Sequence, residues 1–213
     1  EMLRSLVGSE MCIRDSDIID RGERPVDILE YVMDKPNITV LLGNHEVMAR
    51  DFLRRLTAEI TDENTASFDN DFMVELAIYK HNGGIPTINR LLALPPDKQQ
   101  SVLDFIDSLY AYEAIDIGDS TFVLVHAGLG NFRKDKKISE YALYELLELR
   151  PDYERQYFDD DSIYIVSGHT PTKLISGKWE IYHSHNNIVI DCGAAFGGRL
   201  ACLRLEDMAE FYV

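Results

Sequence analysis

The chain has 213 residues, of which 46% are hydrophobic, enough for one sizeable core. Its formal net charge of −16 at pH 7 argues against unaided binding to a nucleic acid polymer, whose phosphates are also negative. No stretch of the sequence approaches the roughly 18 apolar residues of a membrane span. The three cysteines lack the tight spacing of a disulfide framework. We therefore expect a cytoplasmic protein that has neither a membrane nor a nucleic acid polymer as its partner.

The start of the chain differs from the rest. Residues 1–16 show no clean helical or strand period and carry no recognisable signal peptide. We expect them to be a non-native or disordered segment. From Asp17 onward, strand and helix patterns alternate, and we expect a single domain over residues 17–213.

The first part of this domain predicts mostly helices. Pro25 opens a segment whose apolar residues recur at helical spacing. The run ITVLL at 38–42 is typical of a short buried strand, and helical spacing returns over 46–56. Residues 57–110 are more polar and mostly helical in pattern. We expect a helical insert there, which either lines a substrate cleft or forms plain surface helices.

The later part predicts mainly strands. Residues 114–118 and 121–126 read as a hairpin, and 138–150 reads as one amphipathic helix. Four further strands are predicted at 163–166, 180–183, 187–191 and 200–205. The expected fold class is α/β, with two packed mixed β-sheets flanked by helices.

Four short motifs contain most of the candidate functional residues. They read DIIDRG at 17–22, GNHE at 43–46, HAG at 126–128 and SGHTP at 167–171. Each motif alone is weak, because short strings recur by chance. Their order, and their position where predicted strands end, point to one site at the carboxyl edge of a sheet.

Metal ligation is the first function that these motifs suggest. Asp17 offers carboxylate oxygens, Asn44 an amide oxygen, and His126 and His169 offer imidazole nitrogens. This mixed oxygen and nitrogen set suits a hydrolytic divalent metal such as Mn, Fe or Zn. An isolated histidine such as His126 more often has a structural role. The presence of the other three candidate ligands in the same motif set favours a functional role for it.

Proton transfer and phosphate binding are the second and third functions. His45 directly follows Asn44, and Asp20 could hold its ring by a carboxylate–imidazole hydrogen bond, which suits a general acid. Arg21 presents a fork of donors that matches phosphate oxygens, and Gly22 would permit the tight turn that aims it inward. Arg150, expected at a helix end, is either a second phosphate ligand or an ordinary cation there.

With these motifs, the chain resembles the phosphoprotein-phosphatase branch of the calcineurin-like metallophosphoesterases, especially the compact bacterial and phage Ser/Thr phosphatases. The segment DCGAAFGGRL at 191–200 resembles the closing strand pair of that family. The resemblance implies an αββα sandwich and two divalent metals that activate a water molecule. It implies that Asp17 bridges the metals, that an Asp20–His45 pair acts as the acid, and that phosphate is held by four residues: Arg21, Asn44, His45 and, more loosely, Arg150.

Two departures from the family pattern matter. Ser16 stands where the family has a glycine before the bridging aspartate. The first family motif, Gly-Asp-x-His-Gly on the opening strand, is missing from this sequence. We therefore expect an N-terminally truncated sandwich without its first strand, with one complete metal site and weak or absent turnover.

Three functions follow as hypotheses. The first is a phosphomonoesterase that acts on phosphoserine and phosphothreonine in proteins. The second is a hydrolase of dinucleoside polyphosphates or other nucleotide anhydrides, which related enzymes perform with the same core. The third is an inactive fragment that binds phosphate or a partner without turnover. The expected partners are thus a phosphorylated protein or a small phosphate ester.

Overall fold

The computed structural model describes residues 12–13, 16–59, 61 and 68–213. Most of the segment 1–16, expected to be non-native or disordered, lies outside the described residues. The chain divides into two compact units. The helical unit holds residues 17–110, and the sheet unit holds residues 1–16 and 111–213. Among the described residues, no helix is long and apolar enough to cross a bilayer.

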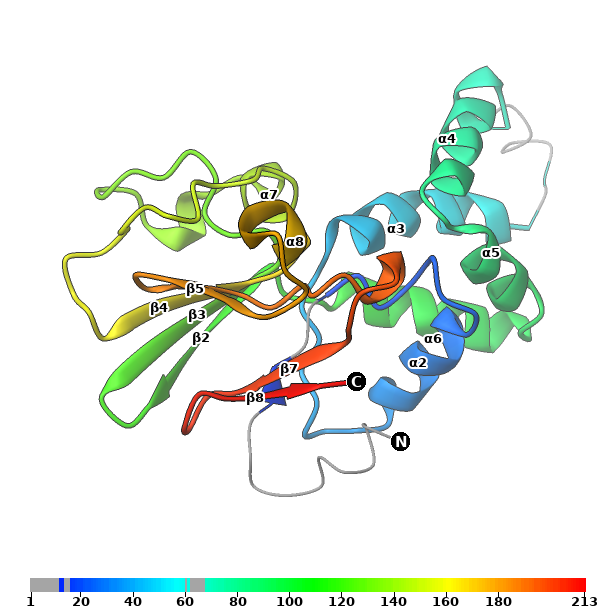
Figure 1. Ribbon diagram of the computed structural model, residues 1–213. Helices are drawn as coiled ribbons and strands as arrows, with labels where there is room; N and C mark the ends of the chain where they lie inside the picture. The colour runs from blue at the N-terminus through cyan, green and yellow to red at the C-terminus, as the bar shows by residue number, and fades with distance from the viewer. Residues whose placement is uncertain (1–11, 14–15, 60, 62–67) are drawn as a thin grey trace. The chain divides into compact units, whose positions relative to one another are not determined.

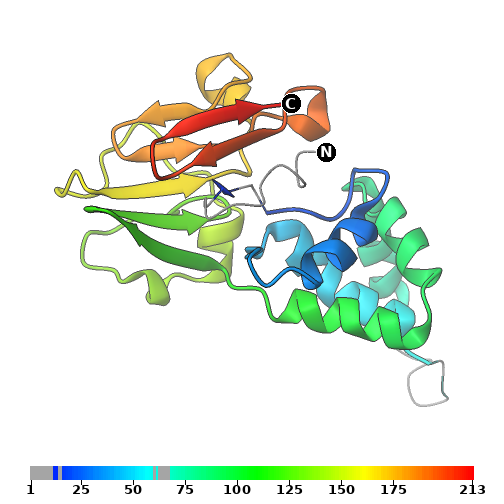
Figure 2. The same cartoon turned by 90° about the horizontal axis from the view of Figure 1, so that it is seen from below.

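In the described part of the helical unit, the chain forms helices α2 to α6, and Figure 2 shows them packed together. Pro25 occupies the first turn of α2, where its missing N–H costs no hydrogen bond. Asp69 caps α4, because its side chain accepts a hydrogen bond from the backbone N–H of Phe72 at 3.0 Å. Within the range of the expected insert, 57–110, the described residues form helices that break at 82–84 and 95, where glycines and a proline stand. The helices are α2 (Pro25–Met33), α3 (Asn44–Thr57), α4 (Asn70–His81), α5 (Ile85–Leu92) and α6 (Pro96–Asp107).

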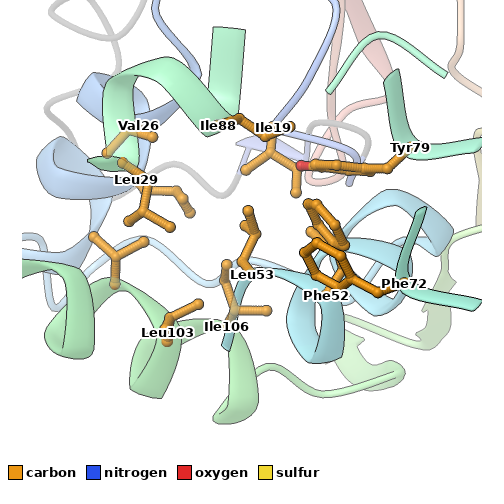
Figure 3. Packing of buried hydrophobic residues seen from close by; sticks show 13 residues of the cluster. Ile19, Val26, Leu29, Phe52, Leu53, Phe72, Tyr79, Ile88, Leu103 and Ile106 are labelled. Carbon is orange, nitrogen blue, oxygen red and sulfur yellow. The ribbon is translucent and has the colours of Figure 1, made fainter. Parts of the chain in front are cut away.

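A single apolar core joins these helices (Figure 3). The rings of Phe52 and Phe72 stack with centroids 5.3 Å apart, and Tyr79 packs on Phe52 at 5.2 Å. Leu29 and Leu53 are completely buried among them. The insert is therefore part of the hydrophobic core of its unit, and its inner faces are not solvent-exposed helix surface.

The predicted buried strand at 38–42 does not form among the described residues. Leu41 makes only an isolated bridge to Tyr110, and the N–H of Leu42 donates to the carbonyl of Tyr110 at 2.8 Å. Ile38 and Val40 are half-buried, and Thr39 is exposed. A strand needs a ladder of partners along its length. The prediction of a buried strand at 38–42 is therefore wrong.

The described residues of the sheet unit form a five-stranded and a three-stranded sheet, whose strands are drawn as arrows in Figure 1. In the five-stranded sheet, of order β2-β3-β4-β6-β5, the pairs β3–β4 and β4–β6 are parallel and the outer pairs are antiparallel. In the three-stranded sheet, of order β1-β7-β8, both pairs are antiparallel. The strands are β1 (Cys12–Ile13), β2 (Tyr112–Ile117), β3 (Ser120–Val125), β4 (Ile163–Ser167), β5 (Tyr182–Ser184), β6 (Asn187–Val189), β7 (Ala201–Arg204) and β8 (Ala209–Tyr212).

The mixed α/β class is confirmed, with three differences in the sheet unit. Only the larger sheet is mixed, because the smaller one is built from hairpin-type pairs. Strands β1 and β8 were not predicted. The strand predicted at 180–183 begins two residues later, at Tyr182. The predicted hairpin and the strands near 163, 187 and 200 are present with boundaries within two residues of those predicted.

The single helix predicted over 138–150 is wrong. The chain forms a 3-10 turn, η2 (Ile138–Glu140), and a short helix, α7 (Leu143–Leu147). Glu145 explains the interruption, because its buried carboxylate accepts from the N–H of Ala142 at 2.9 Å and from Lys136 Nζ at 2.6 Å. This capping arrangement starts a new helix after Ala142, which has extended backbone angles. Two further short helices are α8 (Thr172–Ser176) and η3 (Ala194–Phe196).

Candidate active site

Glu46 holds the DIIDRG loop against the start of α3. Its side chain is completely buried, and Oε2 accepts from the N–H of Gly43 at 3.0 Å and from the N–H of Asp17 at 3.2 Å. The second oxygen, Oε1, accepts from the N–H of Ile19 at 3.3 Å. A Cβ on Gly43 would collide with the carboxylates of Asp17 and Glu46. Gly43 is therefore required for this close approach of loop and helix.

Asp17 lies at the N-terminus of α3. Its Oδ1 accepts from the backbone N–H of His45 at 3.1 Å, and its Oδ2 lies 4.0 Å from His45 Nε2. Helix N-termini favour negative charge, so the position suits a carboxylate. Asn44 is the first residue of α3 and is half-buried. The helical unit thus brings two of the four predicted metal ligands to the same helix end.

Asp20 and His45 form the hydrogen bond that the sequence predicts. Asp20 Oδ2 lies 2.7 Å from His45 Nδ1, and both side chains are almost fully buried. His45 Nε2 lies 2.6 Å from Nη2 of Arg21. A guanidinium has only donors, so Nε2 accepts this bond and Nδ1 carries the proton that is donated to Asp20. The catalytic role of the pair stays a prediction.

Arg21 is held by the break between α4 and α5. Its backbone N–H donates to the carbonyl of Gly83 at 3.0 Å, and Gly83 has a left-handed φ of +96°. A Cβ on Gly83 would come within 2.8 Å of Cγ of Arg21. The break at 82–84 therefore ends the helix, and Gly83 also makes room for the arginine.

The expected role of Gly22 is wrong. The left-handed conformations fall on Asp20 and Arg21, at φ of 65° and 53°, and not on Gly22. A Cβ at position 22 would make only an ordinary contact of 3.7 Å with the carbonyl of Asp20. Asp17 and His169 also have positive φ, at 58° and 63°. Such conformations are unfavourable for side-chain-bearing residues and gather at functional sites.

Two residues of the insert contact Asp20 and were not predicted. The hydroxyls of Tyr79 and Thr87 each lie 2.6 Å from Asp20 Oδ1. Both residues stand in ordinary helical patterns, so the sequence contains no local signal for this contact. Glu46 was recognisable only as the last residue of the GNHE motif.

In the sheet unit, the two predicted histidine ligands lie side by side. His126 follows β3 and His169 follows β4, the carboxyl ends of two neighbouring parallel strands. His126 Nε2 lies 3.1 Å from His169 Nδ1, and the N–H of Gly168 donates to the carbonyl of His126 at 2.7 Å. Ser16 Oγ lies 2.6 Å from the other ring nitrogen of His126. Ser16, which departs from the family pattern, therefore orients this ring.

Arg150 does not end a helix, in contrast to the prediction. It is exposed and follows α7, which stops at Leu147. The next residue, Pro151, closely approaches Gly128 of the HAG motif, where a Cβ would lie 2.7 Å from the proline ring. The loop that carries Arg150 thus packs on the loop after His126, and a role in phosphate binding stays a prediction.

The donor chemistry fits a divalent metal. Two imidazole nitrogens, Nε2 of His126 and Nδ1 of His169, lie 3.1 Å apart within the sheet unit. A carboxylate and an amide stand at one helix end within the helical unit. Carboxylate, amide oxygen and imidazole together suit Mn, Fe and Zn.

Comparisons with known proteins agree with this chemistry. Residues 15–200 match the family described as Calcineurin-like phosphoesterase. The chain is 30% identical to the bis(5'-nucleosyl)-tetraphosphatase PrpE [asymmetrical] of Bacillus thuringiensis (strain Al Hakam), over 90% of this chain and 74% of that protein. It is 27% identical to the protein of the same name from Geobacillus thermodenitrificans (strain NG80-2), over 92% and 76%.

The fold also has a relative among solved structures. A crystal structure described as a proposed diadenosine tetraphosphatase superposes with a TM-score of 0.59 at 13% identity, over 93% of this chain and 77% of the other. At that identity the likeness concerns the fold alone. The match over most of the sequence shows that this chain belongs to the calcineurin-like phosphoesterase family, whose members are hydrolases that use divalent metals.

Proposed function

We propose that this chain is a metal-dependent hydrolase of bis(5'-nucleosyl) tetraphosphates. The observation that supports this substrate is that the relatives from Bacillus and Geobacillus are both named bis(5'-nucleosyl)-tetraphosphatases. The motifs alone favour a protein Ser/Thr phosphatase, with nucleotide anhydride hydrolysis as the second hypothesis. The relatives favour the second function, and the first becomes the alternative that the experiment must exclude.

Four side chains would hold a divalent ion. They are the candidate ligands that the four motifs supply: Asp17, Asn44, His126 and His169. When bound, such ions polarise a phosphoryl group and activate water for attack on phosphorus. In the helical unit, the N–H of His45 fixes Asp17 Oδ1, which supports the use of this carboxylate as a ligand.

His45 is the proposed proton donor to the leaving oxygen. Asp20 orients the ring through Nδ1, so that Nε2 is the nitrogen directed to Arg21. Nε2 can carry a proton only when the guanidinium of Arg21 turns away from it. A phosphate that binds Arg21 would draw the guanidinium off the ring and free Nε2 for protonation.

The nature of the leaving group separates the two substrate classes. Hydrolysis of a phosphoserine expels an alkoxide, which requires protonation, whereas cleavage of an anhydride expels a phosphate oxygen of far lower basicity. An anhydride hydrolase therefore depends less on His45 than a phosphoprotein phosphatase does. Phosphate binding by Arg21, and more loosely by Arg150, Asn44 and His45, serves both substrates alike.

The test compares two substrates with the same preparation. The chain, loaded with Mn²⁺, is incubated with diadenosine tetraphosphate or with a phosphoserine peptide, and products are separated by anion exchange. Asymmetrical cleavage yields one nucleoside triphosphate and one nucleoside monophosphate from each molecule. Release of phosphate from the peptide without cleavage of the dinucleotide would overturn the proposal in favour of the phosphoprotein phosphatase.

The same experiment covers the inactive fragment. If neither substrate is cleaved, elemental analysis shows whether the protein has lost its metal or binds the metal without catalysing hydrolysis. Metal-loaded protein that binds inorganic phosphate without turnover would contradict the hydrolase and support the non-enzymatic hypothesis. Treatment with a chelator, followed by addition of Mn²⁺, is the control for activity that depends on metal.

A further inference from the structure

The helical insert reaches into the Asp20–His45 pair. Tyr79 lies near the end of α4, and Thr87 lies in the first turn of α5. Their hydroxyls both lie 2.6 Å from Asp20 Oδ1, while Oδ2 lies 2.7 Å from His45 Nδ1. Oδ1 of Asp20 thus accepts hydrogen bonds from the insert, and Oδ2 accepts a hydrogen bond from the imidazole. Figure 3 shows the hydroxyl end of Tyr79 beside Ile19, the residue before Asp20.

The direction of these bonds follows from the chemistry of the donors. Burial first, and the charge of the Asp20 carboxylate second, raise the pKa of Tyr79, so its hydroxyl stays protonated and donates. Thr87 Oγ1 donates to the carboxylate and accepts from the backbone N–H of Asp20 at 3.0 Å. Asp20 is therefore fixed through its side chain and its backbone, in spite of its left-handed φ of 65°.

The two donors are themselves rigid. Tyr79 is completely buried and packs on Phe52, and Thr87 is 1% exposed. Gly84 separates the two helices, and a Cβ there would come within 2.5 Å of the Tyr79 ring. Glycine at this position lets α5 start directly against the ring, which places Thr87 three residues later beside Asp20. A tyrosine that served packing alone would need no partner of this kind, because phenylalanine fills the same space.

We propose that Tyr79 and Thr87 are positioning residues for the Asp20–His45 pair, which makes the insert a structural support of the proton donor. By holding Oδ1, they leave Oδ2 in one orientation and so direct the imidazole. The proposal rests on the proposed role of His45 as the acid of a phosphoester hydrolase. It does not depend on which phosphate compound is the natural substrate.

The first test measures leaving-group dependence. Tyr79→Phe and Thr87→Val are compared with the unaltered chain on phenyl phosphate and p-nitrophenyl phosphate, whose leaving groups differ in basicity. A general acid contributes about 10²–10⁴-fold to a rate. We expect a loss of about tenfold in kcat on phenyl phosphate, a smaller loss on p-nitrophenyl phosphate and little change in KM. Thr87→Ser keeps the hydroxyl and is expected to restore kcat.

The same substitution in a chain that already carries Asp20→Asn distinguishes a positioning role from a general loss of structure. In Asp20→Asn chains, Tyr79→Phe is expected to have almost no further effect on kcat, because the side chain acts through Asp20. The same loss in both backgrounds would overturn the proposal. Tyr157→Phe is the matched control, because Tyr157 is also buried but donates to the carbonyl of Asp152 at 2.9 Å, in the other unit. It is expected to leave both rates unchanged.

A spectroscopic measurement works without turnover. The ring N–H of His45, assigned by its loss in His45→Asn, is followed by NMR in the full chain. We expect a proton protected from exchange, whose signal shifts or broadens in Tyr79→Phe and Thr87→Val but not in Thr87→Ser or Tyr157→Phe. An unchanged signal in both of the first two variants would overturn the proposal. A chain that fails to cleave diadenosine tetraphosphate while the signal responds would contradict the substrate proposal alone.

Discussion

Replacement of Glu46 by glutamine tests the clamp on the DIIDRG loop. The buried carboxylate accepts three backbone N–H groups, from Gly43 and Asp17 at one oxygen and from Ile19 at the other. In Glu46→Gln, one of these positions becomes an NH₂ group and faces a donor instead of accepting from it. The remaining bonds lose the assistance of the negative charge.

The size of the effect follows from these three bonds. An unsatisfied buried donor costs about 1–3 kcal/mol, and a hydrogen bond to a charged group contributes about 1.5–3 kcal/mol. We therefore expect Glu46→Gln to lower the free energy of unfolding by about 2–4 kcal/mol. For a chain of this size, each kcal/mol lowers Tm by about 2–4 °C.

The assay is urea unfolding followed by circular dichroism at a helix band. Glu75→Gln is the matched control, because Glu75 is an exposed helical glutamate whose partner is Arg55 at 2.6 Å. Exposed pairs contribute about 0–1 kcal/mol, so the control is expected to stay close to the unaltered chain. If Glu46→Gln were as stable as Glu75→Gln, the argument that this carboxylate anchors the loop would be wrong.

Three other predictions concern the site and its surroundings. Arg21→Lys keeps the charge but loses the forked arrangement of donors. We therefore expect kcat/KM for diadenosine tetraphosphate to fall about 10–100-fold, which corresponds to about 1.4–2.7 kcal/mol. Arg24 is an exposed partner of Asp27, and the control Arg24→Lys is expected to leave kcat/KM unchanged. His169→Ala is expected to lower the amount of Mn²⁺ retained after dialysis, measured by elemental analysis; equal retention would contradict its role as a ligand. The hydrogen bond from Lys136, as the largest cause, lowers the pKa of Glu145. The stability that this interaction contributes is present above the unfolded pKa of about 4.3 and is lost as the pH falls through the lowered pKa of the folded chain. In Glu145→Gln, the urea midpoint is therefore expected to depend less on pH on the acid side.

Much of the local structure could be predicted, because it depends on nearby residues. The helix that starts at Pro25, the breaks at 82–84 and 95, and the hairpin before His126 all have their causes within a few residues of the chain. The hydrogen bond between Asp20 and His45 was also expected, since two neighbouring motifs required it.

Two features of the fold could not be predicted from composition or periodicity, because they depend on pairing and on specific side-chain bonds. The apolar run at 38–42 has the composition of a strand, but pairing decides whether a strand forms, and only Tyr110 pairs with it among the described residues. The segment 138–150 has helical periodicity, but the buried bonds of Glu145 with Lys136 and Ala142 restart the helix. Periodicity reports which side of a helix is apolar and not where a side chain interrupts it.

By itself, the sequence determined the family, because its motifs stand in a fixed order along the chain, and it supplied the candidate residues for metal ligation, proton transfer and phosphate binding. Only the tertiary structure decided what surrounds Asp20. Tyr79 and Thr87 lie 59 and 67 residues away from it. A hydrogen bond over such a separation exists only after the helices pack, since it is the packing of α4 and α5 on α3 and α2 that brings these hydroxyls to the carboxylate.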